Sequence, residues 1–201
     1  MSMDKNSQQG RMLALTFIPL AVALNFGIGA IVKALSLPLY VDSIGTILAT
    51  LLLGWRMGTI VGVLGFVITS VFINPFAIYF VTTQLAIALF VHIVGRRGGF
   101  KSVFKTIVSG VVLGIIAAIV SAPVIILVFQ GATGNGAALL TSFFTKMSNQ
   151  IINSVFLSGF SIEPIDKSLQ CLLAFFILKG IPKNLLENFR SGSLKENNMI
   201  D

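Results

Sequence analysis

Long apolar segments separated by short polar turns make up most of this 201-residue chain. Two tracts, 57–95 and 106–145, contain no Asp, Glu, Lys or Arg at all. Each tract is about twice as long as the roughly 20 residues that a helix needs to cross a bilayer. The pattern therefore predicts an all-α polytopic membrane protein.

Turn residues divide the apolar sequence into six predicted transmembrane helices. The spans are expected at 11–34, 41–53, 57–73, 76–94, 103–129 and 164–181. The short second span is preceded by Asp42 and Ser43, which are suitable N-cap residues. It is followed by a tight turn at Gly54, so the second and third spans form a hairpin.

Segment 137–160 is also apolar enough to form a span. Counting it as one would place the basic C-terminal segment on the side opposite to the other basic loops. Such a placement conflicts with the positive-inside rule. We therefore expect an extra helix over 137–160 that lies in, or re-enters, the outer half of the membrane before the last span.

The distribution of Lys and Arg orients the predicted spans. With a cytoplasmic N-terminus, eleven of the 14 basic residues fall inside, and the outer side holds Lys33, Lys146 and Lys167. This asymmetry places both termini in the cytoplasm. The sequence thus predicts a disordered cytoplasmic tail at 1–10, a single six-helix domain at 11–182 and a cytoplasmic tail at 183–201.

Composition agrees with this class and narrows the function. The chain is 55% hydrophobic and only 10% charged, whereas soluble domains have roughly 25% charged residues. The net charge of +7 does not indicate nucleic-acid binding, because the basic residues fall in loops where topology accounts for them. The single cysteine, Cys171, excludes an internal disulfide.

The motifs of enzymes and of metal or nucleotide sites are absent from the sequence. There is no Gly-x-x-x-x-Gly-Lys-Ser/Thr loop and no His-Glu-x-x-His pair. The one histidine, His92, lies a turn before Arg96 and is interpreted as an interfacial residue. No base is paired with a serine inside the membrane. We therefore expect a protein that is not an enzyme and that needs no metal or cofactor.

Glycines recur at four-residue spacing along the predicted hairpin. Gly54, Gly58 and Gly62 leave a strip of bare backbone on one face of a helix. In lipid, such a strip allows another helix to approach closely. The groove indicates packing within the molecule or, as an alternative, a docking face for a partner.

Uncharged polar residues within the spans supply candidate binding side chains. One group lies within a stripe of about 100° on the helix after residue 136; it comprises Ser142, Thr145, Lys146, Asn149 and Asn153. A stripe of this kind at membrane depth meets a ligand or another helix, unless it forms the wet face of a surface helix. A second group, around the start of the fourth span, comprises Asn74, Tyr79, Thr82, Thr83 and Gln84.

Charged residues occur where the last span is expected to begin. Glu163, Asp166 and Lys167 are interpreted as complementing the helix dipole, with Glu163 and Lys167 paired at i,i+4. This interpretation gives them a structural role only.

Two segments carry a resemblance to a known family. Residues 37–49, with the sequence Leu-Pro-Leu-Tyr-Val-Asp-Ser-Ile-Gly-Thr-Ile-Leu-Ala, are followed by Leu-Leu-Gly-Trp at 52–55 and by Gly62. Residues 163–167 read Glu-Pro-Ile-Asp-Lys and open an apolar helix. These segments resemble the substrate-binding (S) components of energy-coupling factor (ECF) vitamin transporters. The length, the six spans and the cytoplasmic ends also match, so the resemblance covers most of the chain.

The resemblance implies a function and a set of partners. Such a protein lies in the bacterial plasma membrane, captures a vitamin at the outer face and docks on a transmembrane scaffold subunit that two cytoplasmic ATPases drive. Family members use an Ala-x-x-x-Ala pattern in the first span for docking, but here Ala30 and Ala34 are the literal match and lie near the outer end. The docking residues that we expect are Ala14, Ala21, Ala23 and Gly27, together with Gly54, Gly58 and Gly62.

Within the family, the chain most resembles the pantothenate-specific members. Cobalamin and hydroxymethylpyrimidine or thiamine precursors are the alternatives. We expect the pocket in the outer half, lined by Tyr40, Asn74, Thr83, Gln84, Lys146, Asn149 and Asn153. In this interpretation Lys146 holds a carboxylate, and the two Asn side chains bind amide and hydroxyl groups.

Two other classes of function remain open at this point. A self-sufficient secondary transporter would be favoured by an inverted repeat and by a buried ionisable residue in mid-span. The sequence shows neither. A structural or assembly protein of the membrane would be favoured if the polar stripe faced bulk water.

Overall fold

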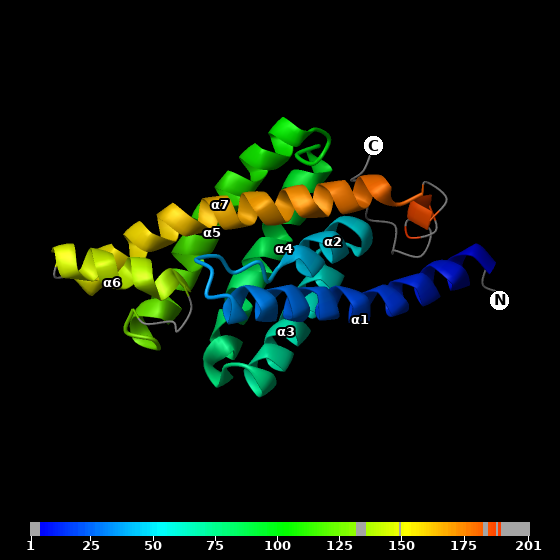
Figure 1. The fold of residues 1–201 in the computed structure, drawn as a ribbon. Coiled ribbons are helices and arrows are strands. Elements are labelled where there is room, and N and C mark those ends of the chain that lie inside the picture. The colour runs from blue at the N-terminus through cyan, green and yellow to red at the C-terminus, as the bar shows by residue number, and fades with distance from the viewer. Residues whose placement is uncertain (1–4, 132–135, 149, 183–184, 188, 190–201) are drawn as a thin grey trace.

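The computed structural model describes residues 5–131, 136–148, 150–182, 185–187 and 189, which fold into helices joined by short turns (Figure 1). No strand occurs among these residues. The elements are α1 (Lys5–Ala34), α2 (Ile44–Leu53), α3 (Trp55–Phe72), the 3₁₀ helix η1 (Pro75–Phe80), α4 (Val81–Arg96), α5 (Val103–Leu127), α6 (Gly136–Ser148) and α7 (Ile151–Gly180). The all-helical class predicted from the sequence is confirmed.

Four segments of the described chain are long and apolar enough to cross a membrane. They are Leu15–Ala34 in α1, Trp55–Phe72, Pro75–Arg96 and Val103–Leu127. The protein is therefore a multi-pass membrane protein, and the count of six spans stays a prediction. The 30-residue α7 is also long enough to span, but charged residues interrupt its apolar sequence.

The short helix α2 forms the centre of the molecule. It packs against α1, α3, α4 and α7, and all ten of its residues are buried. Gly45 of α2 lies so close to α1 that a Cβ atom there would come within 2.7 Å of the Ala21 carbonyl carbon. At the other end of α2, Gly54 has a φ of 94°, a left-handed conformation that lets the chain reverse into α3.

α5 and α7 pack against each other in opposite directions over much of their lengths (Figure 1). Small residues set their close approach: a Cβ atom on Gly110 would come within 2.9 Å of the Ser168 nitrogen, and one on Gly114 within 2.5 Å of the Glu163 carbonyl carbon. Gly114 lies near the middle of α5, a helix without charged residues beyond Lys105. This contact therefore places Glu163 level with the middle of an apolar membrane helix.

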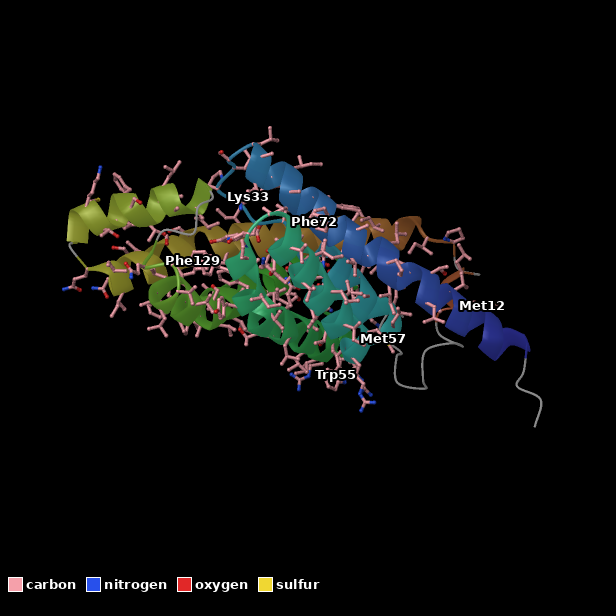
Figure 2. All side chains as sticks on the ribbon, turned by 90° about the horizontal axis from the view of Figure 1, so that it is seen from below. Met12, Lys33, Trp55, Met57, Phe72 and Phe129 are labelled. Carbon is pink, nitrogen blue, oxygen red and sulfur yellow. The ribbon has the colours of Figure 1, made fainter. Side chains whose placement is uncertain are left out.

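The ends of several helices gather at one end of the molecule. In Figure 2, Lys33 and Phe129 lie to the left and Phe72 above the centre, whereas Trp55 lies below the centre and Met12 to the right. Lys33 is in the last turn of α1, Phe72 is the last residue of α3, and Phe129 follows the end of α5. α6 extends further in the same direction and folds back along the first half of α7 (Figure 1).

The last helix differs from our expectation. α6 ends at Ser148 and α7 runs without a break from Ile151 to Gly180, whereas we predicted one helix over 137–160 and a span that begins near Pro164. Pro164 instead lies inside α7, where its backbone packs on Gly114. Neighbouring helices commonly hold a membrane helix together across a proline, so the charged residues lie in mid-helix and not at a helix start.

The beginning of the chain also differs. α1 begins at Lys5, so residues 5–10 are helical and not part of a disordered tail. Lys and Gln are good helix formers, and no proline separates this segment from the apolar part of α1. Residues 1–4 and 190–201, which belong to the predicted tails, lie outside the described residues.

Candidate ligand-binding site

A cavity of about 130 Å³ lies among α1, the loop 35–43, α3, η1, α4, α5 and α7. Its volume is roughly ten times the 10–15 Å³ that one water molecule needs, so it suits a small organic molecule. Lys33 and Phe129 both line it, and both lie left of the centre of the view in Figure 2, away from Met12. Its wall has a charged part, a hydrogen-bonded polar part and an aromatic part.

The charged part is built around Lys167 of α7. Its ammonium nitrogen lies 2.7 Å from Asp166 Oδ2, 3.5 Å from Glu163 Oε2 and 3.6 Å from Asp42 Oδ1. The Lys167 side chain is 3% exposed, that of Glu163 6% and that of Asp166 0%. Three carboxylates therefore surround one buried ammonium; two of them are buried, and that of Asp42 is 28% exposed. Among the described residues, no group of His, Cys, Asp and Glu side chains is arranged to hold a metal ion.

Asp166 also holds the loop that precedes α2. Its Oδ1 accepts hydrogen bonds from the backbone N–H groups of Tyr40 and Val41, both at 3.0 Å. Val41 has a φ of 44°, which is an unusual conformation for a β-branched residue. The backbone of Ser43 is fixed in the same way, because its N–H donates to Gln170 Oε1 at 2.8 Å. α7 thus holds the loop in a strained shape beside the cavity.

Tyr40 extends from this loop into the cavity wall. Lys167 Nζ lies 5.8 Å from the centre of its ring. Burial raises the pKa of the Tyr40 hydroxyl, and the carboxylates of Glu163 and Asp166 raise it further. Tyr40 is therefore a neutral hydroxyl beside the cavity at physiological pH, able both to donate and to accept a hydrogen bond.

A chain of buried hydrogen bonds forms the polar part of the wall. Asn25 of α1 donates to the Thr46 hydroxyl at 3.0 Å, and Thr46 donates to Gln84 Oε1 of α4 at 2.7 Å. Gln84 donates to the Ser43 hydroxyl at 2.7 Å, which in turn donates to Asp42 Oδ1 at 2.8 Å. The Ser43 side chain thus serves this network and makes no capping bond to α2. Since each bond constrains the next, α1, α2 and α4 hold these side chains in fixed positions.

Phenylalanines form the aromatic part of the wall. The rings of Phe80 and Phe129 are stacked with centroids 5.6 Å apart, and Phe66 lies 6.4 Å from Phe80. All three line the cavity. A site with apolar surface and a few placed polar groups is typical of small-molecule binding.

Three polar groups of the lining have spare bonding capacity. Thr83 Oγ1 and Glu163 Oε2 are buried and have no hydrogen-bond partner among the described residues. Lys33 is half-buried, and no ion pair within the described part of the chain involves it. Buried polar atoms normally have partners, so these groups are the ones that a ligand would satisfy.

Four of the sequence-predicted binding residues lie in this cavity. Tyr40, Asn74, Thr83 and Gln84 all line it. Asn74 also acts as a turn residue, since its side chain caps η1 by accepting from the Phe76 N–H at 3.2 Å. Three members of the second polar group thus meet at one site, whereas Tyr79 and Thr82 are exposed and do not line the cavity.

The predicted polar stripe lies elsewhere. Lys146 of α6 and Asn153 of α7 are exposed and do not line the cavity, and Asn153 donates to Gln150. Asn149 lies outside the described residues. Helical periodicity does not continue across the break between Ser148 and Ile151, so these residues do not share one helical face.

The residues expected at a partner interface separate into two sets. A Cβ atom on Gly62 would come within 2.7 Å of Gln84 Cβ, and one on Gly58 within 3.0 Å of Thr50 Cβ. Gly54 is buried at the α2–α3 turn. The chain's own helices therefore fill the glycine groove and leave no room there for a partner.

The remaining expected docking residues lie on α1. Ala21 is buried against α2, and the side chain of Ala14 lies outside the described part of the chain. Ala23 is exposed, and Gly27 has open space where a Cβ atom would lie. Ala23 and Gly27 are thus the members of the set that α1 presents outward.

Sequence reasoning missed the charged part of the wall. Glu163, Lys167, Asp42, Asn25 and Lys33 line the cavity but were not among the predicted binding residues. The signal was present, because an ionisable residue within an apolar membrane segment indicates a functional site. Because we expected the last span to begin near Pro164, we placed Glu163 and Lys167 at the membrane boundary and did not recognise them as ionisable residues within a membrane segment.

Comparisons with known proteins assign no family to the chain. No family profile, no curated protein sequence and no solved structure matches it.

Proposed function

We propose that this protein is a membrane-embedded binding subunit for a small organic molecule of the vitamin class. The observation that carries the proposal is the cavity of about 130 Å³, lined by a fixed polar network, a charged cluster and aromatic rings. Because hydrogen bonds hold the network in place without a ligand, little ordering would oppose binding.

In this proposal the chain acts as the S component of an ECF importer, as the sequence resemblance implies. It takes the vitamin from the outer face and delivers it together with a scaffold subunit and two ATPases. The sequence has no nucleotide-binding loop of its own, so partners would supply the energy. The outward pair Ala23 and Gly27 on α1 is suited to close contact with a partner helix.

Pantothenate is the first candidate for the ligand, on the basis of the resemblance. The cavity supports it in one respect, because Lys33 lines the wall and is able to pair with a carboxylate. Lys33 thereby takes the role that we had expected for Lys146.

A self-sufficient secondary transporter is the second candidate. It is favoured by the buried Glu163, Asp166 and Lys167 in the middle of α7, a feature that we did not expect from the sequence. Ionisable residues at this depth occur in transporters that move protons or ions with a substrate.

One pair of measurements tests the proposal and separates the two candidates. Mass spectrometry of an extract from the purified chain would identify the bound molecule, and uptake of that molecule would be measured in vesicles. The binding-subunit proposal expects a bound vitamin, with uptake only when scaffold and ATPases are added. Uptake by the chain alone under a proton or sodium gradient would favour the secondary transporter, and an extract without a small molecule would contradict both.

A further inference from the structure

We infer that the ligand of this cavity presents an N–H or O–H group, and not a carboxylate, to Glu163, and that the Thr83 hydroxyl is its second contact. The inference rests on the proposed binding function and specifies the chemistry of the ligand. Two independent observations carry it, one on α7 and one on α4.

The first observation is the incomplete bonding of Glu163. Its side chain is 6% exposed, and Oε2 accepts no hydrogen bond from any described residue. Lys167 lies 3.5 Å away, but its ammonium is closer to Asp166, to which it donates at 2.7 Å. A buried carboxylate oxygen without a donor is costly. A ligand donor in the cavity removes that cost.

The charge balance decides which ligand group fits here. Asp42, Glu163 and Asp166 all lie within 3.6 Å of the Lys167 ammonium, which is the one cation that pairs with them among the described residues. A ligand carboxylate at Glu163 would add a further negative charge to this cluster. A hydroxyl, amide or amine satisfies it instead, and any acid group of the ligand belongs beside Lys33.

The second observation is the unpartnered hydroxyl of Thr83. Several other threonines in the helices donate to the carbonyl oxygen four residues earlier, as Thr50, Thr69 and Thr106 do. Thr83 is the third residue of α4, and α4 follows directly on η1. The preceding turn therefore has 3₁₀ geometry, and its carbonyls are not aligned as in an α-helix. Thr83 is 7% exposed, lines the cavity and has no partner among the described residues.

Titrations of the purified full-length chain test the inference. Isothermal titration with pantothenate, pantothenol, thiamine, hydroxymethylpyrimidine and cobalamin first identifies which probe binds, and solvent extraction identifies any molecule that copurifies. That molecule is then titrated into Glu163→Gln and Thr83→Val. Glu163→Gln should lower the affinity about tenfold or more, since a hydrogen bond to a charged group contributes about 1.5–3 kcal/mol and each 1.4 kcal/mol is a factor of ten. Thr83→Val should lower it about two- to tenfold, since a hydrogen bond between neutral groups contributes about 0.5–1.5 kcal/mol.

Matched controls come from the same chain. Glu187→Gln and Thr82→Val make the same chemical changes at exposed positions outside the cavity, and both should bind as the parent does. If pantothenate is the ligand, Lys33→Met should weaken its binding but leave that of pantothenol, which lacks the carboxylate, unchanged.

A test on the wild-type chain avoids the question of whether the variants fold. Analogues of the identified ligand are prepared in which each N–H or O–H group is methylated in turn. At least one methylated analogue should bind about tenfold more weakly.

The possible results separate the inference from the proposed function. If every methylated analogue binds as well as the parent ligand, the inference is wrong while the binding function stands; bound water is then the partner of Glu163 and Thr83. Folded Glu163→Gln and Thr83→Val proteins with unchanged affinity lead to the same conclusion. If no probe binds and nothing copurifies, both the inference and the proposed function fail.

Discussion

α5 and α7 are long helices that pack against each other, but their buried faces differ in chemistry. The buried face of α5 carries no charged residue: it combines small and apolar residues such as Gly110 and Gly114 with the hydroxyl residues Thr106, Ser109 and Ser121. The buried residues of α7 include Glu163, Asp166 and Lys167. Packing in a membrane needs close fit, which α5 supplies without charge. The charges of α7 are therefore not needed for the close approach of the two helices: Asp166 holds the loop before α2, and Glu163 and Lys167 line the cavity.

The largest expected effect comes from the fit between the two helices. In Gly114→Leu, the new side chain would meet the backbone of Glu163 and Pro164, which cannot move aside. Overpacking typically costs about 1–3 kcal/mol, and contact with backbone atoms should place this variant above that range. Size-exclusion chromatography in detergent should show little folded protein. Gly27→Ala is the control, because its Cβ enters open space; folded protein at wild-type yield in Gly114→Leu would contradict the contact.

The next effect concerns the charges of α7. Lys167→Met leaves Asp42, Glu163 and Asp166 without their shared cation. Removing one partner of a buried ion pair costs about 3–5 kcal/mol, so Tm should fall clearly. Adding Glu163→Gln to Lys167→Met should recover part of the loss. Lys105→Met, at an exposed site on α5, should leave Tm near that of the parent. An unchanged Tm in Lys167→Met would show that the cluster is not a coupled unit.

A smaller loss is expected at the glycine groove. Gly58→Leu would press on Thr50 and on the Thr46 carbonyl inside the chain. The expected cost is about 1–3 kcal/mol, read as a lower Tm of the isolated chain without any partner. If Tm is unchanged and only binding to the scaffold is lost, the groove serves a partner and not the chain itself.

The smallest effect is expected at the polar stripe. Asn153→Ala and Lys146→Met change exposed side chains that do not line the cavity. Ligand affinity and Tm should both stay within experimental error of the parent. A tenfold loss of affinity in either variant would show that the ligand binds at the polar stripe predicted from the sequence.

The features that could be predicted from the sequence are those that depend on local composition and on single turn residues. The helical membrane class follows from composition, and the α2–α3 hairpin follows from the turn at Gly54. Thr83 and Gln84 could be found because polar residues are conspicuous in a tract without charges.

The parts that could not be predicted depend on tertiary contacts. α7 continues through Pro164 because Gly110 and Gly114 of α5 pack against it, and no local signal reveals that support. Because α7 is continuous, Glu163 and Lys167 lie in mid-helix and not at the helix end that the sequence predicted. Conversely, Asn149 and Asn153 were grouped with the binding residues because a single helix was assumed across the break that follows Ser148.

Native mass spectrometry of the purified chain tests the central claim most directly. Ala77 is buried in η1 and lines the cavity, so Ala77→Trp should fill it. The wild-type chain should carry one small molecule, Ala77→Trp should carry none, and Asn153→Trp, at an exposed site outside the cavity, should retain it. A bound molecule that persists at the same occupancy in folded Ala77→Trp would contradict binding in this cavity.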